Sequence, residues 1–464
     1  MKLPTAVPGS RALSSVHGKI ELILLCFPNL ANNPLEVHDR YAALFRALPK
    51  ESKFAIIVQY SDSFRSAGSI SKYARTVQEV ICGLMYEAEM HPKYLESIII
   101  DPLVDYKLYH RRRNIRGAFK HTDYLPSEWA QDPFLVLKRS PDEYALLEPV
   151  HFANTNIYKL GDQLVADYVA AQLDFMVKPF ALQLEGGNVL VGDRYVLLGS
   201  EILYKNWLYF RKVLSFEQIT NHFRWTLGIE TIIWIGADDV NLPDYTGREE
   251  RVQLLQKLRH IDMFITLGGK TQDGEDLVFV ANLTEESSIA VTPALRKAFN
   301  TYFDRVADLL RGYNNGGIRF KVERLPLLLY NVGDRVFMSF NNCLVEEHEH
   351  GKFAYLPHYD ADTEDLQQRF EDMENLAIET FRRNNFHVTS IPENFSVRAR
   401  SNGSLHCMAK VLKRSDYGNV GRSPDLQKPD SLWIDEQLMR DLGILAAFRQ
   451  APWLLAGDYS SHFR

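Results

Sequence analysis

The chain has 464 residues, and its formal net charge is −6 at pH 7. Phosphate binding relies on an excess of lysine and arginine over the contact surface, so this balance argues against a protein whose main task is to bind nucleic acid. Hydrophobic residues make up 46% of the chain, which is enough for a large core without help from disulfides or structural metals.

The chain has four cysteines that lie far apart and show no CxxC spacing: Cys26, Cys82, Cys343 and Cys407. This usage disfavours both a zinc site and a disulfide framework, and a reducing, cytoplasmic compartment fits it best. The apolar run from Ile20 to Phe27 is interrupted by Glu21 and is too short for a membrane span. We therefore expect a buried strand there and no membrane partner.

Short apolar runs alternate with longer amphipathic segments from Lys19 to about Leu412, which is typical of a mixed α/β fold. In chain order, the runs predict strands at Glu21–Cys26, Phe54–Gln59, Ser97–Ile100, Phe134–Lys138, Val189–Leu198, Ile232–Ile235, Met263–Leu267, Leu277–Ala281, Phe320–Glu323, Val336–Phe340 and Leu405–Leu412. The amphipathic segments predict helices at Glu36–Leu48, Ile70–Glu89, Gln163–Leu173, Phe216–Leu227, Arg248–Leu258, Pro293–Gly312 and Glu364–Asn384.

The composition changes near Leu412, where a passage rich in Ser, Asp, Gly and Pro runs to about Pro429. A predicted helix, Trp433–Phe448, and an aromatic tail follow. We therefore expect an N-terminal arm over residues 1–18 and one α/β domain over residues 19–412. Residues 413–464 form a C-terminal linker and helical appendage in this division.

Four short sequences place polar groups at or near strand ends: Trp129-Ala130-Gln131-Asp132-Pro133-Phe134, Leu184-Glu185-Gly186-Gly187-Asn188, His260-Ile261-Asp262-Met263-Phe264 and Asn402-Gly403-Ser404-Leu405-His406-Cys407. Each is weak evidence by itself, because charged residues and glycines are frequent at strand ends for structural reasons. In a strand, the side chains of His260 and Asp262 would point to the same face. A thiol such as Cys407 is reactive only where a nearby cation stabilises its thiolate, and a buried inert cysteine is the usual case.

The four motifs together, in this order, resemble those of the guanidine-modifying superfamily, which includes arginine, agmatine and peptidylarginine deiminases and amidinotransferases. The resemblance spans Trp129 to about Leu412. It implies the pentein fold, an α/β-propeller of pseudo-five-fold ββαβ repeats, here with a C-terminal extension. Agmatine and peptidylarginine deiminases carry their nucleophile after a histidine, as Cys407 follows His406.

The resemblance also implies a role for each polar residue. Cys407 is the expected nucleophile, and His260 is the expected proton carrier, oriented by Glu185. Asp132 and Asp262 are expected to hold the guanidinium, because carboxylates form bidentate hydrogen bonds with it. Further candidates for the pocket wall are Gly187, Asn188, Arg259, His406, Asn341-Asn342, Tyr355-Leu356-Pro357 and His358.

The implied reaction is hydrolysis of a guanidino group to a ureido product and ammonia, without metal or organic cofactor. The expected partner is a small guanidino substrate or an arginine-containing peptide, and a homo-oligomer fits the class. An amidinotransferase remains the alternative, because it shares the same residues and differs only in the acceptor. A cysteine protease built on Cys407 and His260, and a catalytically inactive pentein that acts as a binding module, are the alternatives of other classes.

Overall fold

The structure of the chain is a computed structural model. It describes residues 10–27, 34–48, 51–58, 67–89, 91–100, 127–149, 162, 165–180, 182–209, 214–236, 260–332, 334–401 and 403–416. Two predicted helices, Arg248–Leu258 and Trp433–Phe448, lie outside these residues. Within the described part, no helix combines the length and the apolar composition that a membrane crossing needs.

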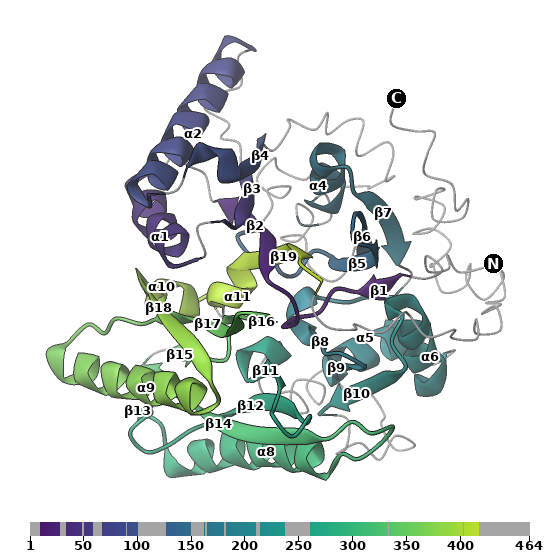
Figure 1. Cartoon of the computed structure of the whole chain (residues 1–464). Coiled ribbons are helices and arrows are strands. Elements are labelled where there is room, and N and C mark those ends of the chain that lie inside the picture. The colour runs from purple at the N-terminus through teal and green to yellow at the C-terminus, as the bar shows by residue number, and fades with distance from the viewer. Residues whose placement is uncertain are drawn as a thin grey trace.

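The strands of the described chain form five sheets, which follow one another around the centre of the molecule in Figure 1. The first sheet contains β2 (Ile20–Phe27), β3 (Lys53–Val58), β4 (Leu95–Ile100) and β19 (Ala409–Arg414). The second contains β1 (Arg11–Ala12), β5 (Leu135–Ser140), β6 (Glu143–Pro149) and β7 (Met176–Phe180). The third contains β8 (Val189–Val191), β9 (Tyr195–Gly199) and β10 (Thr231–Ile235). The fourth contains β11 (Ile265–Lys270), β12 (Asp276–Asn282), β13 (Ser288–Ile289), β14 (Phe320–Val332) and β15 (Asp334–Ser339), and the fifth contains β16 (Leu344–His348), β17 (Gly351–His358) and β18 (Phe386–Asn394).

All five sheets share one connection pattern. Each contains an antiparallel pair: β19–β2, β5–β6, β8–β9, β11–β12 and β16–β17. A helical crossover then leads to a third strand that lies parallel to the second: β3, β7, β10, β14 and β18. The fold is therefore a mixed α/β fold with a repeated ββαβ order, and the first unit is closed by the two ends of the described chain.

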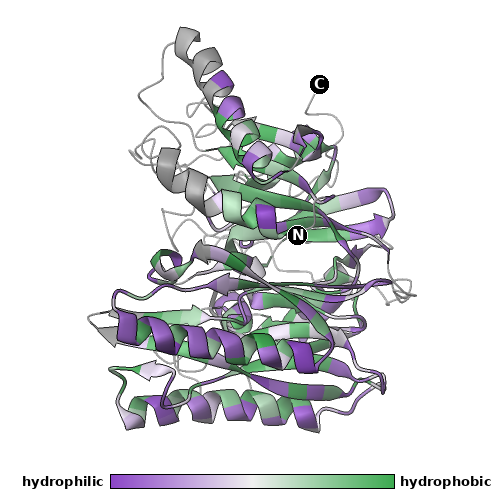
Figure 2. Ribbon diagram, turned by 60° about the vertical axis from the view of Figure 1, so that its left-hand side comes forward, coloured by the Kyte–Doolittle hydropathy of each residue, from purple (hydrophilic) through white to green (hydrophobic). Residues whose placement is uncertain are grey.

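The crossover helices are α1 (Pro34–Ala47), α4 (Val165–Leu173), α5 (Ser200–Tyr209), α6 (Phe216–Leu227), α8 (Pro293–Gly312) and α9 (Glu364–Arg383). Helix α2 (Ala67–Glu87) joins β3 to β4, and two short helices, α10 (Ser396–Ala399) and α11 (Leu405–Met408), precede β19. In Figure 2 the strands are mostly hydrophobic, whereas hydrophilic residues run along the outer helices. This distribution is typical of helices that cover the sheets and face solvent.

The predicted boundaries of α6 and α8 are confirmed, because their first turns have strong local signals. Ser215 and Gln218 form a capping box, in which each side chain bonds the backbone N–H of the other residue. The hydroxyl of Thr292 accepts the N–H of Leu295, and Pro293 occupies the first turn.

The prediction of one strand over Val189–Leu198 is wrong. The segment forms a hairpin of β8 and β9, and the N–H of Gly192 donates to the carbonyl of Tyr195 across the turn. Both strands are apolar and buried, so the sequence pattern of Val189–Leu198 is that of one continuous strand and does not indicate the turn. Strand β16 was missed for the opposite reason, because three of its five residues are ionisable although the whole strand is buried.

One buried cation joins three distant parts of the fold. The guanidinium of Arg414 in β19 is 3% exposed, and it donates to the backbone carbonyls of Ser15, Val16, Gly18 and Val345. These bonds connect β19 to the segment after β1 and to β16. Part of the predicted arm over residues 1–18 therefore belongs to the sheet region, since β1 also pairs with β5.

We expect Arg414→Met to destabilise the protein by about 3 kcal/mol, because it leaves buried carbonyls without donors. The measurement is urea unfolding. Arg400→Met serves as the matched control, since Arg400 is 59% exposed and pairs only with Asp362 at the surface. Its effect should stay within about 0.5 kcal/mol. Equal effects of the two substitutions would contradict the role of Arg414.

Candidate active site

Five chain segments meet at the candidate active site, and each lies just ahead of the first strand of an antiparallel pair. The segments carry Asp132 ahead of β5, Glu185 ahead of β8, His260 and Asp262 ahead of β11, Asn342 ahead of β16, and Cys407 ahead of β19. Because the sheets share one connection pattern, equivalent loops bring together side chains that are distant in sequence. All five polar residues that the motifs predicted lie in this place.

Cys407 lies in the helical turn α11 and not in a strand, so the predicted strand over Leu405–Leu412 is wrong for its first half. The reason is tertiary. The side chain and the carbonyl of Asn342 accept the N–H groups of Cys407 and His406, each at 3.2 Å, which replaces strand pairing. The thiol is 4% exposed.

His260 and Asp262 also do not share a strand face. His260 has an extended backbone and is followed by a single 3-10 turn, η8 (Ile261–Met263). The turn directs the two side chains to different partners. His260 faces Glu185, whereas Asp262 faces His406 and Cys407.

The predicted pair of Glu185 and His260 is present, with Glu185 Oε2 2.7 Å from His260 Nε2. Gly187 lies in the 3-10 turn η6 (Gly186–Asn188), and a Cβ there would come within 2.6 Å of His260 Nδ1. Only glycine therefore lets the turn pack against the imidazole. Asn188 accepts the N–H of Ile261 at 3.2 Å and so joins η6 to η8.

Asp132 lies on the other side of the imidazole, with Oδ1 3.6 Å from His260 Nδ1. Its side chain accepts the N–H of Gly187 at 3.2 Å, and its carbonyl accepts the N–H of Gly186. The preceding N–H, that of Gln131, donates to the carbonyl of Cys407 at 3.1 Å. The loop that carries Asp132 is thus fixed both to η6 and to the turn of the thiol.

Asp262 is the acid next to the thiol. Its Oδ2 is 2.8 Å from His406 Nδ1 and 3.7 Å from Cys407 Sγ. Its Oδ1 is buried and has no hydrogen-bond partner within the described residues. A buried carboxylate oxygen without a donor is costly, so this atom is a natural acceptor for a ligand N–H group.

Asn342 is the residue whose role the motifs did not reveal, since the Asn341-Asn342 pair suggested only a wall position. It is fully buried, and its Nδ2 donates to Cys407 Sγ at 3.2 Å. An amide donor on sulphur favours the thiolate over the thiol. The repeated connection pattern is the signal that could have found it, because Asn342 lies in the loop ahead of β16, as Glu185 lies in the loop ahead of β8.

The charges of the site act on the pKa values of Cys407 and His260 in a consistent way. Burial raises the pKa of the Cys407 thiol well above its ordinary value, and the carboxylates of Asp262 and Asp132 raise it further. Burial alone would lower the pKa of His260, but Asp132 and Glu185 outweigh it and raise that pKa. In the site without ligand, these shifts favour the charged form of the imidazole and the neutral form of the thiol.

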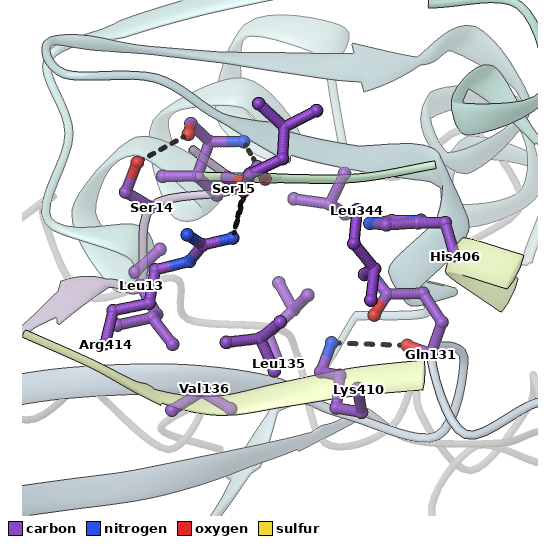
Figure 3. A pocket seen from close by; sticks show the side chains of 15 residues that line it. Leu13, Ser14, Ser15, Gln131, Leu135, Val136, Leu344, His406, Lys410 and Arg414 are labelled. Carbon is purple, nitrogen blue, oxygen red and sulfur yellow. Dashed lines mark hydrogen bonds between the residues drawn. The ribbon is translucent and has the colours of Figure 1, made fainter. Parts of the chain in front are cut away.

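Of the predicted wall residues, Gly187, Asn188 and His406 belong to the site as described, and Arg259 lies outside the described residues. His406 also lines a cavity of about 50 Å³. Figure 3 shows this cavity between His406, Gln131 and two cations of β19, Lys410 and Arg414. The motifs did not single out Lys410.

A metal could in principle use three of these groups, since ligand atoms of Asp132, Glu185 and His260 lie within 4.8 Å of one another. Both imidazole nitrogens, however, already face carboxylates, and Nε2 is bonded to Glu185 at 2.7 Å. A charged imidazole has no lone pair for a metal. The trio is accounted for as an ion-pair network, and we assign it no metal.

We expect Glu185→Gln to lower the pKa of His260, because the substitution removes a carboxylate at hydrogen-bond distance. Titration of the histidine ring protons by NMR measures this midpoint, which should lie above the ordinary value of about 6.5 in the unchanged protein. Glu201→Gln is the matched control, since Glu201 bonds Asn188 and Lys205. An unchanged midpoint in Glu185→Gln would refute the pairing.

The fold of the chain is similar to that of solved agmatine deiminases. Agmatine deiminase of Enterococcus faecalis matches with a TM-score of 0.54 and 15% identity, over 89% of this chain and 99% of that chain. The agmatine deiminase of C. jejuni matches with a TM-score of 0.52 and 14% identity, over 89% and 99%. Neither a family model nor a curated protein sequence matches the chain. The predicted resemblance to pentein enzymes is thereby confirmed for the fold.

Proposed function

We propose that the chain is a deiminase, which hydrolyses a guanidino group to a ureido product and ammonia through a covalent intermediate on Cys407. One observation carries the proposal. Three carboxylates, Asp132, Glu185 and Asp262, gather with a buried thiol, and Asp262 Oδ1 has no partner within the described residues. Such a site needs a cation with several N–H donors. The similar solved structures are agmatine deiminases, which supports the same substrate class.

A guanidinium fits this need because it is planar, permanently charged and presents its donors in a fixed fork. Asp262 would accept one N–H group through Oδ1, and Asp132 would accept from the other side. Charge-assisted bonds of this kind are roughly twice as strong as neutral ones. A neutral urea has no charge to offer, so the product would leave.

The same two acids explain how the thiol becomes a nucleophile. They raise the pKa of Cys407 in the site without ligand. A bound guanidinium cancels their charge, and it then stabilises the thiolate instead, together with the amide of Asn342. The substrate would therefore activate its own attacking group.

In the first half of the reaction, the Cys407 thiol releases its proton to solvent once the guanidinium is bound, and its sulphur forms a bond to the guanidinium carbon. One C–N bond breaks, and His260 gives its proton to the departing amine, which leaves as ammonia. The product on the enzyme is an S-alkylthiouronium. The raised pKa of His260 favours the charged imidazole that this step needs.

In the second half, the neutral His260 takes a proton from water as the oxygen bonds to the same carbon. The C–S bond breaks, the ureido product forms, and the thiol of Cys407 is restored. Glu185 holds the imidazole in one orientation through both halves, as the third member of a catalytic triad does.

We also propose that the five sheets are the blades of a pentein α/β-propeller. Its catalytic unit would comprise residues 19–412, extended by β1 with the segment that follows it and by the end of β19 at Arg414. The repeated ββαβ order and the fold of the solved agmatine deiminases support this arrangement. The pairing of β19 with β2 completes the first blade from both ends of the unit.

The test incubates the protein with agmatine, free arginine and an arginine-containing peptide, and it follows ammonia and ureido product. We expect turnover of at least one compound without an added amine acceptor. Cys407→Ser should lower kcat by at least about 10³-fold, because serine is a far weaker nucleophile. Cys82→Ser, on α2 outside the site, should retain full activity.

Three results would oppose this proposal in different ways. Ammonia release that depends on an acceptor amine would favour the amidinotransferase. Peptide cleavage would favour the protease. Absence of ammonia and ureido product with all three compounds, together with a Cys407 that does not react with a haloacetamidine, would favour the inactive binding module.

We expect the activity to survive dialysis against EDTA, because both imidazole nitrogens of His260 already face carboxylates. The measurement is the rate of ammonia release before and after dialysis, and again after addition of Zn²⁺ or Mn²⁺. Loss of activity that a metal restores would overturn the assignment of Asp132, Glu185 and His260 as a metal-free network.

A further inference from the structure

Lys410 is a buried cation that the proposed reaction does not use. It lies in β19 and is 4% exposed. Its ammonium donates to the carbonyl of Gln131 at 3.2 Å and lies 5.5 Å from the centre of the Phe134 ring. The remaining space near it is the cavity of about 50 Å³ that Figure 3 shows. A lysine is almost never this buried without a charged partner.

The partners at a distance are the acids of the candidate site. Gln131, whose carbonyl accepts the ammonium, directly precedes Asp132, and a Cβ on Gly186 would lie 3.2 Å from Nζ. The titratable or charged side chains around Lys410 come from every neighbouring element: Asp132 ahead of β5 with the Glu185–His260 pair behind it, Asp262 in η8, His406 and Cys407 in α11, and Arg414 in β19. Negative charge dominates on the side of the thiol.

We propose that Lys410 is the internal counter-cation of Asp132 and Asp262, and that binding of a guanidinium to these acids releases the proton of Lys410. The inference rests on the proposed function, since it assumes that the two acids hold a guanidinium. Lys410 acts through the acids and is therefore a positioning residue for charge.

The physical reason is that Asp132 and Asp262 would have to stabilise two neighbouring cations, the ammonium of Lys410 and the bound guanidinium. Two acids stabilise each of two cations less than they stabilise a single one. Burial lowers the pKa of Lys410 to about 7, although Asp132 and Asp262 counteract it by raising that pKa. Once a guanidinium neutralises these acids, the carbonyl of Gln131 and the ring of Phe134 remain, and they offset less of the cost of a buried ammonium than two carboxylates do. The cavity beside Nζ is large enough for water, which gives the proton a way out.

The inference predicts that a guanidinium binds more tightly as the pH rises through about 7, because less work is then needed to remove the proton. The test uses Cys407→Ser, which binds without turnover, and titrates it calorimetrically with agmatine, arginine and the arginine-containing peptide. The Kd of the compound that binds should fall by about tenfold between about pH 6 and about pH 8.

Two further variants, built on Cys407→Ser, separate Lys410 from its neighbours. Lys410→Met should bind at pH 6 as tightly as the parent binds at pH 8, and its Kd should be nearly independent of pH. Lys410→Arg keeps a fixed charge and should bind weakly at both values. Lys413→Met is the matched control, because Lys413 in the same strand lies over the rings of Tyr144 and Phe175 instead, and it should keep the pH dependence of the parent.

The outcomes distinguish this inference from the proposed function. Tight binding whose pH dependence is the same in Lys410→Met as in the parent overturns the inference and leaves the proposed function intact. Failure of all three compounds to bind at any pH overturns both. If Lys410→Met does not fold, proton release is measured directly in Cys407→Ser. The heat of binding is recorded in buffers of different ionisation enthalpy, and its dependence on that enthalpy gives the number of protons released. Proton release by Cys407→Ser near pH 6.5 supports the inference, and its absence overturns it.

Discussion

A buried thiol surrounded by carboxylates is the constraint on which this site depends. Charge is expensive to bury, and each acid of the site has therefore found a partner: Glu185 faces His260, Asp262 faces His406, and Asp132 accepts a backbone N–H group. The compensation is incomplete, because Asp262 Oδ1 stays without a donor within the described residues. The excess of negative charge favours the neutral form of the thiol, and under the proposed function it would favour a cationic, hydrogen-bonding ligand.

The fold can hold these acids close together, because different loops of the chain carry them. Five loops, each ahead of an antiparallel pair, supply one polar group or pair to the site. The loops are braced against one another by backbone contacts, such as the N–H of Gln131 on the carbonyl of Cys407. Carboxylates on loops fixed in this way cannot move apart. A cationic ligand would relieve their mutual repulsion, and this relief would favour binding.

The strand that follows Cys407 also carries two cations inward, Lys410 and Arg414. They have different tasks in the fold. Arg414 donates to four carbonyls and fixes the segments it joins, whereas Lys410 has one carbonyl and a cavity beside it. A cation with few local bonds responds to distant charge, so Lys410 couples the interior to the state of the acids.

The sequence by itself determined the site composition and much of the secondary structure. Cys407, His260, Glu185, Asp132 and Asp262 could be selected in advance because local motifs in a fixed order carry them. Helices α6 and α8 could be bounded because capping is a local interaction between neighbouring residues.

Only the tertiary structure decided what depends on distant contacts. The turn at Cys407 replaces a strand because Asn342, from another sheet, takes its N–H groups. Strand β16 is buried despite its charges, because Ile20 and Tyr355 donate to Glu346, and the ammonium of Lys352 lies 3.6 Å from Glu347. The inward direction of Lys410 is likewise invisible in a sequence, where a lysine is expected at the surface. These hydrogen bonds and charge interactions join residues that are distant in the sequence, so a local sequence pattern cannot indicate them.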